Sequence, residues 1–404
     1  MNSQIKNKIL IIPSWYPTEK MPIEGSVFQE QALAMKHLYD IKIFYPKRTE
    51  NNRLLRLFNA LLFIIKIKPS IEFVEDNFAN DPGKFSFHYK SGINRLNIEG
   101  KMLVWQCNAA FEKIINNGWK PDLIHAQCTV YGGIISYFIS KKYNVPFIIT
   151  EHNVFLLHSY YKEIQGLMKS ALEKAEIVLS VSEHQKRMIL MHNINCNPVV
   201  VGNMIDENIF RIAPKKHNIF TILYISFDHF IKDNKTFFKA VKLFKQKSKG
   251  PFTVKLLGRS HRPDETNPFF ILAKDYDLNN NIEIIENVSR DKIVNYFQDA
   301  DVLVSTSIAE TFGVSMCEAL FCGVPIISTA NGGVDDMIDN KNGIKVNIKD
   351  EIAICDALLK IINREIIFDP QEIRNSVINK FGKEVFIKRI DNIYKTAINR
   401  ATSF

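Results

Sequence analysis

Two glutamates, Glu310 and Glu318, stand eight residues apart in the stretch ETFGVSMCE and are the strongest candidates for chemistry in this sequence. The apolar run VLVS precedes them and GVPIIST follows, which predicts a strand, a loop, a short helix and a second strand. If the helix begins near Val314, the backbone amides of Phe312, Gly313 and Val314 are free donors that favour an anion. Gly313 would let that ligand approach the backbone closely. The stretch therefore predicts a site for a ligand that carries a phosphate.

The two carboxylates would serve different ends of that ligand. Glu318 lies about one turn into the helix, where it can accept hydrogen bonds from the two neighbouring hydroxyls of a ribose. Glu310 precedes the helix and would reach a sugar at the other end of the phosphate group. The alternative is that Glu310 lies on a surface loop and Glu318 forms an ordinary salt bridge. If the two acids stood alone, without the surrounding motif, this alternative would be the better interpretation. The Phe-Gly turn, the strand ends and the Gly-x-Pro behind them favour a functional site.

Four further candidates follow from the rule that open parallel sheets bind ligands beyond the carboxyl ends of their strands. His152 follows PFIIT, Gly25 and Ser26 lie beyond ILIIPSW, and Lys232 lies beyond ILYIS. With Glu310 they are expected to face one crevice between two domains. For His152 the alternative is a buried histidine whose hydrogen bonds are satisfied inside the protein.

The elements that must position these residues form two series of short apolar runs alternating with helical patterns. The first series includes KILIIPS, IKIFY, DLIHA, PFIIT and EIVLSVS, and the second TILYIS, FTVKLLG, NIEIIE, DVLVSTS and PIIST. Near-continuous apolar strands between helices predict parallel sheets covered on both faces. The fold class is therefore α/β with two doubly wound domains, which also suits a length of 404 residues. We expect residues 1–207 in the first domain and 208–384 in the second.

The composition is typical of a globular protein and argues against a membrane-spanning protein. The chain is 46% hydrophobic and 24% charged, with no run near the ~18 apolar residues of a membrane span. The apolar run at 9–12 is expected to be a strand and not a signal peptide. Six scattered cysteines without a CxxC pair indicate reduced thiols and a cytoplasmic protein. The net charge of +9 indicates an anionic partner, and no nucleic-acid-binding motif accompanies it.

The segment RLLRLFNALLFIIKIK at 53–68 is apolar through its middle and basic at both ends. One interpretation is a helix in the interface of an anionic membrane surface, with its basic residues at the lipid phosphates. The other is a helix packed on its own domain, which the nearly complete apolar circumference favours. The sequence leaves both open.

The longer stretch SIAETFGVSMCEALFCGVPIISTANGG resembles the donor-site signature of retaining glycosyltransferases of the GT-B fold, specifically glycosyltransferase family 4. It is similar to that family's E-x7-E motif and the glycine pair behind it. PSWYPTEKMPIEGSVFQEQALAM, DLIHAQ, IITEHN, VSEHQKRMI and GNMIDENIF resemble other family segments in order, so the similarity covers nearly the whole chain. The resemblance implies two Rossmann-like domains facing across a cleft, with the final helix at 385–404 packed back on the first.

The family's donor-site roles carry over to matching positions. The resemblance implies that Glu318 holds the donor ribose and Glu310 the transferred sugar. It implies that Phe312, Gly313 and Val314 contact sugar hydroxyls and phosphate through their backbone.

Four more positions match the family's diphosphate and sugar contacts. Gly25 and Ser26 match the small-residue loop near the diphosphate, and His152 matches a histidine near the transferred sugar. Lys232 matches the lysine that neutralises the leaving diphosphate.

One departure from the family pattern concerns charge at the diphosphate. The family usually has an arginine before the lysine, in Gly-Arg-Leu, whereas this chain reads SFDHFIK, with Ser226 or Phe227 at that place. Arg259, which also follows a strand, is expected to supply the missing charge.

The function implied is transfer of a sugar, with retention, from a UDP- or GDP-linked sugar to an acceptor hydroxyl, in surface polysaccharide or lipopolysaccharide synthesis. The acceptor is expected to be a glycan or lipid-linked glycan bound near residues 53–90, at the inner membrane face. No cofactor or metal is expected, since the DYD at 275–277 and the DAD at 299–301 are poorly placed for one. The alternatives are a GT-B-fold nucleotide-sugar epimerase and a non-catalytic nucleotide-sugar-binding subunit.

Overall fold

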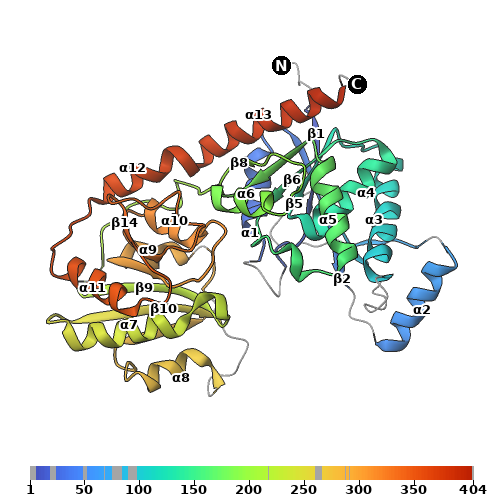
Figure 1. The fold of residues 1–404 in the computed structure, drawn as a ribbon. Coiled ribbons are helices and arrows are strands. Elements are labelled where there is room, and N and C mark those ends of the chain that lie inside the picture. Colours follow the sequence, from blue (N-terminus) through green and yellow to red (C-terminus); the bar gives the residue numbers. More distant parts are fainter. Residues whose placement is uncertain are drawn as a thin grey trace. The chain divides into compact units, whose positions relative to one another are not determined.

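The computed structural model describes residues 6–18, 24–48, 52–67, 69–74, 84–89, 98–216, 218–259, 266–286, 288–290 and 292–402. Two compact units make up the chain. The first contains Met1–Val181, Lys186–Val201 and Ile387–Phe404, and the second contains Ser182–Gln185 and Gly202–Phe386. Each unit is built around one sheet with helices, so the predicted class of two doubly wound α/β domains is confirmed (Figure 1).

The first unit contains an eight-stranded sheet in the order β3-β4-β2-β1-β5-β6-β7-β8. All neighbouring strands run parallel except β3 and β4, which pair antiparallel at one edge. The strands are β1 (Lys8–Pro13), β2 (Asp40–Arg48), β3 (Phe73–Val74), β4 (Lys84–Tyr89), β5 (Leu123–Gln127), β6 (Phe147–Glu151), β7 (Ile177–Ser180) and β8 (Val199–Val200). Every residue of β5 and β6 is buried, as expected for central parallel strands covered on both faces.

In the described part of this unit, five helices and the last parts of two more, α6 and α13, accompany the sheet. They are α1 (Ser26–Met35), α2 (Arg53–Ile64), α3 (Ile98–Asn116), α4 (Ile134–Tyr143), α5 (Lys162–Lys174), α6 (Glu183–Leu190) and α13 (Lys383–Thr402). The end of α13 is fixed by polar contacts in this unit. The hydroxyl of Tyr394 lies 2.7 Å from Nδ1 of the buried His125, and the hydroxyl of Tyr39 donates to Asp391 at 2.7 Å.

The second unit contains a six-stranded, fully parallel sheet in the order β11-β10-β9-β12-β13-β14. Its strands are β9 (Phe220–Phe227), β10 (Phe252–Arg259), β11 (Ile282–Glu286), β12 (Val302–Ser305), β13 (Ile326–Thr329) and β14 (Gly343–Val346). Its helices are α7 (Asn234–Lys247), α8 (Pro268–Asp275), α9 (Ile293–Asp299), α10 (Val314–Phe321), α11 (Glu351–Ile362) and α12 (Pro370–Phe381). The core includes large aromatic side chains among aliphatic ones, and the rings of Tyr224 and Phe237 stack with centroids 3.7 Å apart.

The strand order fixes where each sheet can bind a ligand. In the second sheet the order reverses between β9 and β12, and in the first between β1 and β5. In open parallel sheets, ligands generally bind beyond the carboxyl ends of the strands at such a reversal point. In the part of the chain that the structure describes, no helix is long and apolar enough to span a membrane.

Candidate active site

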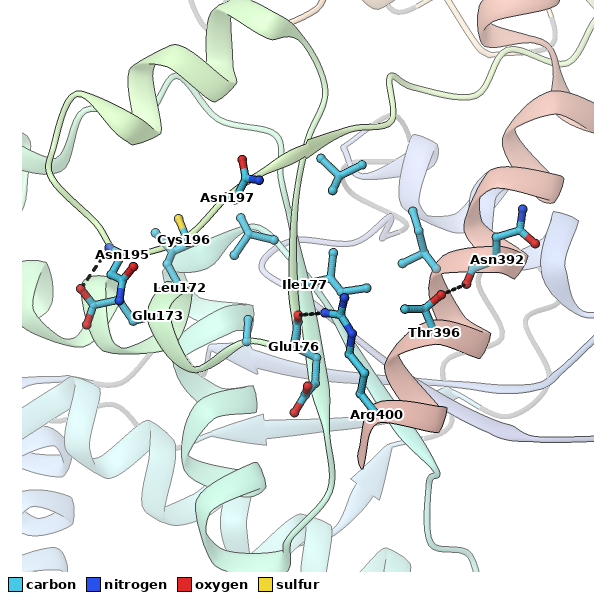
Figure 2. Close-up of a pocket in the computed structure, with 14 residues that line it drawn as sticks. Leu172, Glu173, Glu176, Ile177, Asn195, Cys196, Asn197, Asn392, Thr396 and Arg400 are labelled. Atoms are coloured by element: carbon cyan, nitrogen blue, oxygen red, sulfur yellow. Dashed lines mark hydrogen bonds between the residues drawn. The ribbon is translucent and has the colours of Figure 1, made fainter. Parts of the chain in front are cut away.

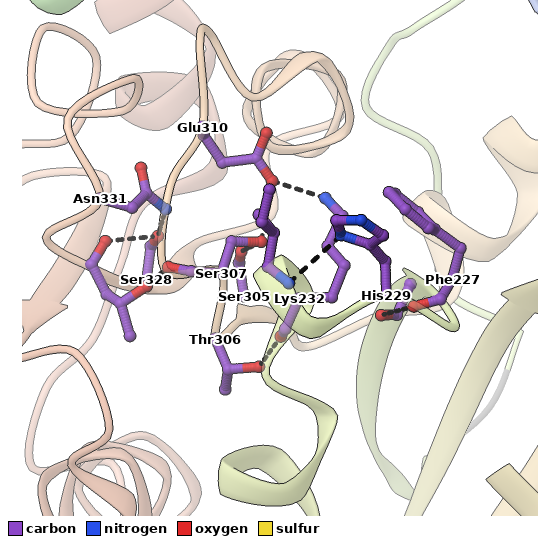
Figure 3. Close-up of polar contacts among 12 residues, drawn as sticks. Phe227, His229, Lys232, Ser305, Thr306, Ser307, Glu310, Ser328 and Asn331 are labelled. Carbon is purple, nitrogen blue, oxygen red and sulfur yellow. Dashed lines mark hydrogen bonds and ion pairs between the residues drawn. The ribbon is translucent and has the colours of Figure 1, made fainter. Parts of the chain in front are cut away.

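Lys232 and Glu310 form an ion pair at the reversal point of the second sheet. Nζ of Lys232 donates to Oε1 of Glu310 at 2.6 Å, and the Ser307 hydroxyl donates to the same oxygen at 2.8 Å (Figure 3). The side chains of the pair are 18% and 17% exposed, so they are shielded from bulk water but accessible to a ligand. The structure therefore brings these two predicted residues together.

The position of Lys232 follows from the ends of β9 and β12. Lys232 closes a short 3-10 turn (Phe230–Lys232) that comes soon after β9. The Thr306 hydroxyl donates to the carbonyl of Lys232 at 2.8 Å, which ties this turn to the end of β12. The Tyr224 hydroxyl donates to Asn234 at 2.8 Å and fixes the start of α7 behind it. The lysine is thus held by backbone contacts and not by its own side chain alone.

The place of the family arginine is taken by uncharged groups. The Ser226 hydroxyl donates to Asn234 at 2.6 Å. The ring of the exposed Phe227 lies under the Lys232 ammonium, 5.2 Å from the ring centroid, and this cation–π contact helps to position the ammonium. Arg259 pairs with Phe227 at the ends of β10 and β9, while its side chain lies outside the described part of the structure.

The glycine pair after β13 packs against the Glu310 loop. Glu310 forms a parallel bridge with Gly332, and its amide donates to the carbonyl of Asn331 at 3.3 Å. A Cβ atom on Gly333 would lie 2.5 Å from the carbonyl oxygen of Glu310, so no larger residue fits there. The glycines therefore act by letting two backbones approach, which presents Glu310 at a fixed angle.

Helix α10 begins at Val314, as predicted, with Gly313 at its N-cap and no side-chain cap. Besides the expected close approach of a ligand, the structure gives Gly313 a second reason to be a glycine. Its φ is +83°, and a Cβ atom would lie 2.5 Å from Cε of Met316 and 3.0 Å from Cγ1 of Val334. The glycine is thus required by its own conformation and packing. Phe312 is buried, and its ring meets that of Phe381 edge-on at 5.0 Å.

Glu318 is buried on α10 and forms an ion pair with the guanidinium of Arg290, which follows β11. The side chain of Glu318 is only 2% exposed, and the Arg290 guanidinium lies 5.0 Å from the ring centroid of Phe210. The salt bridge considered from the sequence is therefore present at Glu318, and Arg290 is a residue that the sequence did not single out. Burial, followed by the charge of Glu318, raises the pKa of the Cys322 thiol to about 12.

In the first unit, His152 follows β6 and contacts the first turn of α1. Its Nε2 lies 2.7 Å from Oε1 of the buried Gln127, and its ring centroid lies 4.7 Å from that of Phe28. Gly25 directly precedes α1, and Ser26 is its buried first residue. The three predicted residues of this unit therefore gather at the carboxyl ends of β1, β5 and β6.

Glu151 is a second residue here that the sequence did not single out. Its buried carboxylate accepts hydrogen bonds from the amides of Thr129 at 3.0 Å, His152 at 2.9 Å and Asn153 at 2.9 Å. Burial, followed by the charge of Glu151, raises the pKa of Tyr160. By joining the chain after β5 to the chain after β6, Glu151 holds His152 in place. Only its position at the end of a strand could have indicated it.

Together the described residues could bind a phosphate, accept hydrogen bonds from hydroxyl groups and present an oriented histidine. The second unit provides a shielded cation, Lys232, and the uncapped amino end of α10, both suited to phosphate. It also provides acceptors for hydroxyl groups in Glu310 and Ser307. The first unit provides a histidine whose orientation is fixed by a buried amide, Gln127.

Two protein-family models match the chain. The model described as Glycosyl transferases group 1 matches residues 205–381, and the model described as Glycosyltransferase Family 4 matches residues 76–208. Together they cover the region that carries the site residues of the second unit and His152.

Curated relatives carry related names. An uncharacterized glycosyltransferase of Methanocaldococcus jannaschii, MJ1178, is 23% identical over 60% of this chain and 66% of its own. The α-monoglucosyldiacylglycerol synthase of Acholeplasma laidlawii is 23% identical over 81% of this chain and 87% of its own. The capsular polysaccharide biosynthesis glycosyltransferase CapM of Staphylococcus aureus is 25% identical over 70% of this chain and 78% of its own.

Solved structures share the fold. Sucrose-phosphate synthase of Thermosynechococcus elongatus matches with a TM-score of 0.73 at 18% identity, over 96% of this chain and 98% of its own. Anabaena HepE in complex with UDP and glucose matches with a TM-score of 0.72 at 14% identity, over 96% of this chain and 100% of its own. The predicted GT-B architecture is therefore confirmed.

Proposed function

We propose that this protein is a glycosyltransferase, because the chain has the GT-B fold and is similar to glycosyltransferases of group 1 and family 4. It transfers a sugar from a nucleoside diphosphate sugar to an acceptor hydroxyl with retained configuration. The observation that carries the proposal is the shielded Lys232–Glu310 pair at the reversal point of the second sheet.

The proposed step breaks the bond between the anomeric carbon and the diphosphate oxygen while the acceptor oxygen bonds to the same face of that carbon. The acceptor proton passes to the departing phosphate oxygen. Lys232 stabilises the negative charge that grows on this diphosphate, and the amino end of α10 adds a partial positive charge. Glu310 accepts hydrogen bonds from hydroxyls of the transferred sugar and thereby orients it.

The donor is proposed to be UDP- or GDP-linked. The complex of HepE with UDP and glucose supports this for a protein of the same fold. In this chain, Glu318 would receive the ribose hydroxyls, His152 the transferred sugar, and the loop of Gly25 and Ser26 the diphosphate. Because Lys232 can supply the positive charge, we propose that the reaction needs no metal.

The acceptor is proposed to be a glycan or a lipid-linked glycan, in the synthesis of a surface polysaccharide or glycolipid. The names of two relatives support this class, since one makes a glycosylated diacylglycerol and the other acts in capsular polysaccharide biosynthesis. The comparisons do not favour an epimerase or a non-catalytic binding subunit.

The test is a panel of UDP- and GDP-sugars incubated with glycan and lipid-linked acceptors, with product configuration read by NMR. Calorimetry with UDP and GDP first identifies the nucleotide. We expect one donor class to be consumed only when an acceptor is present, with the α or β configuration kept. Turnover of the donor into an epimer without acceptor, or binding without turnover, would contradict the proposal.

A further inference from the structure

Helix α2 (Arg53–Ile64) exposes an apolar face that its own unit does not use. Leu54, Phe58, Leu61 and Ile65 are each between 52% and 76% exposed. Their spacing of three and four residues places them on one face of the helix. Four large apolar side chains in a row make a continuous apolar stripe in contact with water.

The opposite face of α2 is the one that packs on the unit, and its buried positions hold one polar and one small residue. Asn59 and Ala60 are buried there, and Phe63 meets Trp105 of α3 with ring centroids 5.4 Å apart. A helix that only covers a core has its apolar stripe inward and its polar residues outward. In α2 the four large apolar side chains of the stripe stay exposed while Asn59 is buried, so burial within its own unit does not explain the apolar stripe.

The charges around the stripe indicate what covers it. The segment 53–68 contains Arg53, Arg56, Lys66 and Lys68 and no acidic residue. Arg53 and Lys66 are exposed at the two ends of the helix. An apolar stripe with cations at both ends matches a bilayer surface, where acyl chains lie beneath anionic phosphates. A second copy of the same segment would instead bring like charges together.

The length of the helix determines how it would lie. Twelve residues span ~18 Å, whereas the hydrocarbon core of a bilayer is ~30 Å thick. The helix is therefore too short to cross and would rest in the interface plane, with the stripe ~5–10 Å below the phosphates.

We propose that α2 is an in-plane anchor that binds this protein to the surface of a bilayer containing acidic phospholipids. Leu54, Phe58, Leu61 and Ile65 enter the acyl region, and Arg53 and Lys66 bind lipid phosphates. This proposal is independent of the proposed glycosyl transfer. Vesicle binding is measured without donor or acceptor, so its result does not depend on whether the protein transfers a sugar.

The experiment is flotation of the full chain with vesicles of phosphatidylcholine alone or mixed with phosphatidylglycerol. We expect binding to the mixed vesicles that weakens as salt is added. The affinity of the variant L54Q/F58Q/L61Q for the mixed vesicles should fall by about a hundredfold or more, because three apolar side chains no longer enter the bilayer. The variant R53Q/K66Q should bind the mixed vesicles about fivefold more weakly per charge removed, and its preference for them over phosphatidylcholine should shrink by the same factor.

A matched control makes the same polar change at exposed isoleucines of the second unit. Ile352 and Ile367 are 60% and 80% exposed, and I352Q/I367Q should float like the unchanged protein. Circular dichroism and UDP calorimetry check that L54Q/F58Q/L61Q is folded. Absence of binding to acidic vesicles, or equal binding by L54Q/F58Q/L61Q, would overturn the proposal. So would a dimer in light scattering that this variant converts to a monomer, because the stripe would then be an interface between copies.

Discussion

Nζ of Lys232 lies 2.6 Å from Oε1 of Glu310, although the two residues are 78 positions apart in the chain. Each is partly buried, and each neutralises the charge of the other. A pair of this kind keeps both side chains extended toward one point, so neither has to be ordered when a ligand arrives. The Ser307 hydroxyl donates a hydrogen bond to the same carboxylate oxygen.

Replacing Lys232 by alanine should lower kcat by roughly 10²–10³ fold, since one well-placed charge on the leaving group is removed. Steady-state kinetics with the identified donor measures this. K235A is the matched control, because Lys235 is an exposed lysine three residues away on α7. Glycosyl transfer by K232A at the rate of K235A would contradict the role given to Lys232.

Glu318 is expected to bind the ribose hydroxyls of the nucleotide, so replacing it should weaken the preference for a ribonucleotide. The unchanged protein should bind UDP (or GDP) about tenfold or more tightly than the 2′-deoxy nucleotide, and E318Q should lose most of that preference, because charged hydrogen bonds contribute ~1.5–3 kcal/mol. Calorimetry of the two nucleotides gives both affinities. The control E283Q changes an exposed glutamate on β11 that is paired with Lys255. An unchanged preference in E318Q would rule out ribose binding by this carboxylate.

Comparing alanine variants of Gly313 and Gly118 separates the cost of backbone strain from the cost of overpacking. Both have φ near +80°, but a Cβ atom at Gly118 would meet no atom within 4 Å, whereas at Gly313 it would overlap Met316. G118A should cost about 1 kcal/mol in the free energy of unfolding, from conformation alone. G313A should cost about 2–4 kcal/mol, because overpacking is added. Urea unfolding followed by circular dichroism compares them, and equal costs would show that Met316 moves aside freely.

His125 should make the stability of the protein depend on pH. Burial lowers the pKa of this histidine from 6.5 to about 3. Below about pH 6.5 the unfolded chain binds a proton that the folded chain does not, so stability falls as pH falls and the loss ends near pH 3. Between about pH 7.5 and pH 5 the expected loss is about 2 kcal/mol.

Two glutamine variants test this prediction, with H125Q removing the buried histidine and H88Q serving as the control. H125Q should be less stable near neutral pH, because it loses contacts to Tyr394 and Thr150, but it should lack this part of the pH dependence. H88Q changes an exposed histidine on β4 and should keep it. Urea unfolding at both pH values measures the difference. The same acid loss in H125Q and H88Q would show that His125 is protonated in the folded protein.

Local patterns predicted the scaffold and much of the candidate site. The apolar runs became strands because a parallel strand covered on both faces needs apolar residues throughout, and α10 begins at Val314 because Gly313 supplies the conformation before it. Lys232 and Glu310 could be anticipated since both follow strands, and the carboxyl ends of neighbouring strands share one edge.

The partners of these residues could not be predicted in the same way. Gln127 and His152 stand at the ends of different strands, and Arg290 follows β11 whereas Glu318 lies on α10, so no local spacing relates either pair. The packing against Gly313 could not be predicted either, because its close neighbour Val334 lies well along the chain. Such contacts depend on how loops return to the sheet, which short-range patterns do not encode.

The sequence by itself determined the two parallel α/β units and the strand ends that carry charged and small residues, because hydrophobic periodicity and glycine conformation act over a few residues. Only the tertiary structure decided which charges pair and which face of a helix is covered. For α2 the sequence allowed burial or exposure of its apolar side chains, and the structure turns Asn59 inward and Leu54 outward. That choice depends on the shape of the surface that the helix meets, which is formed by residues distant in the chain.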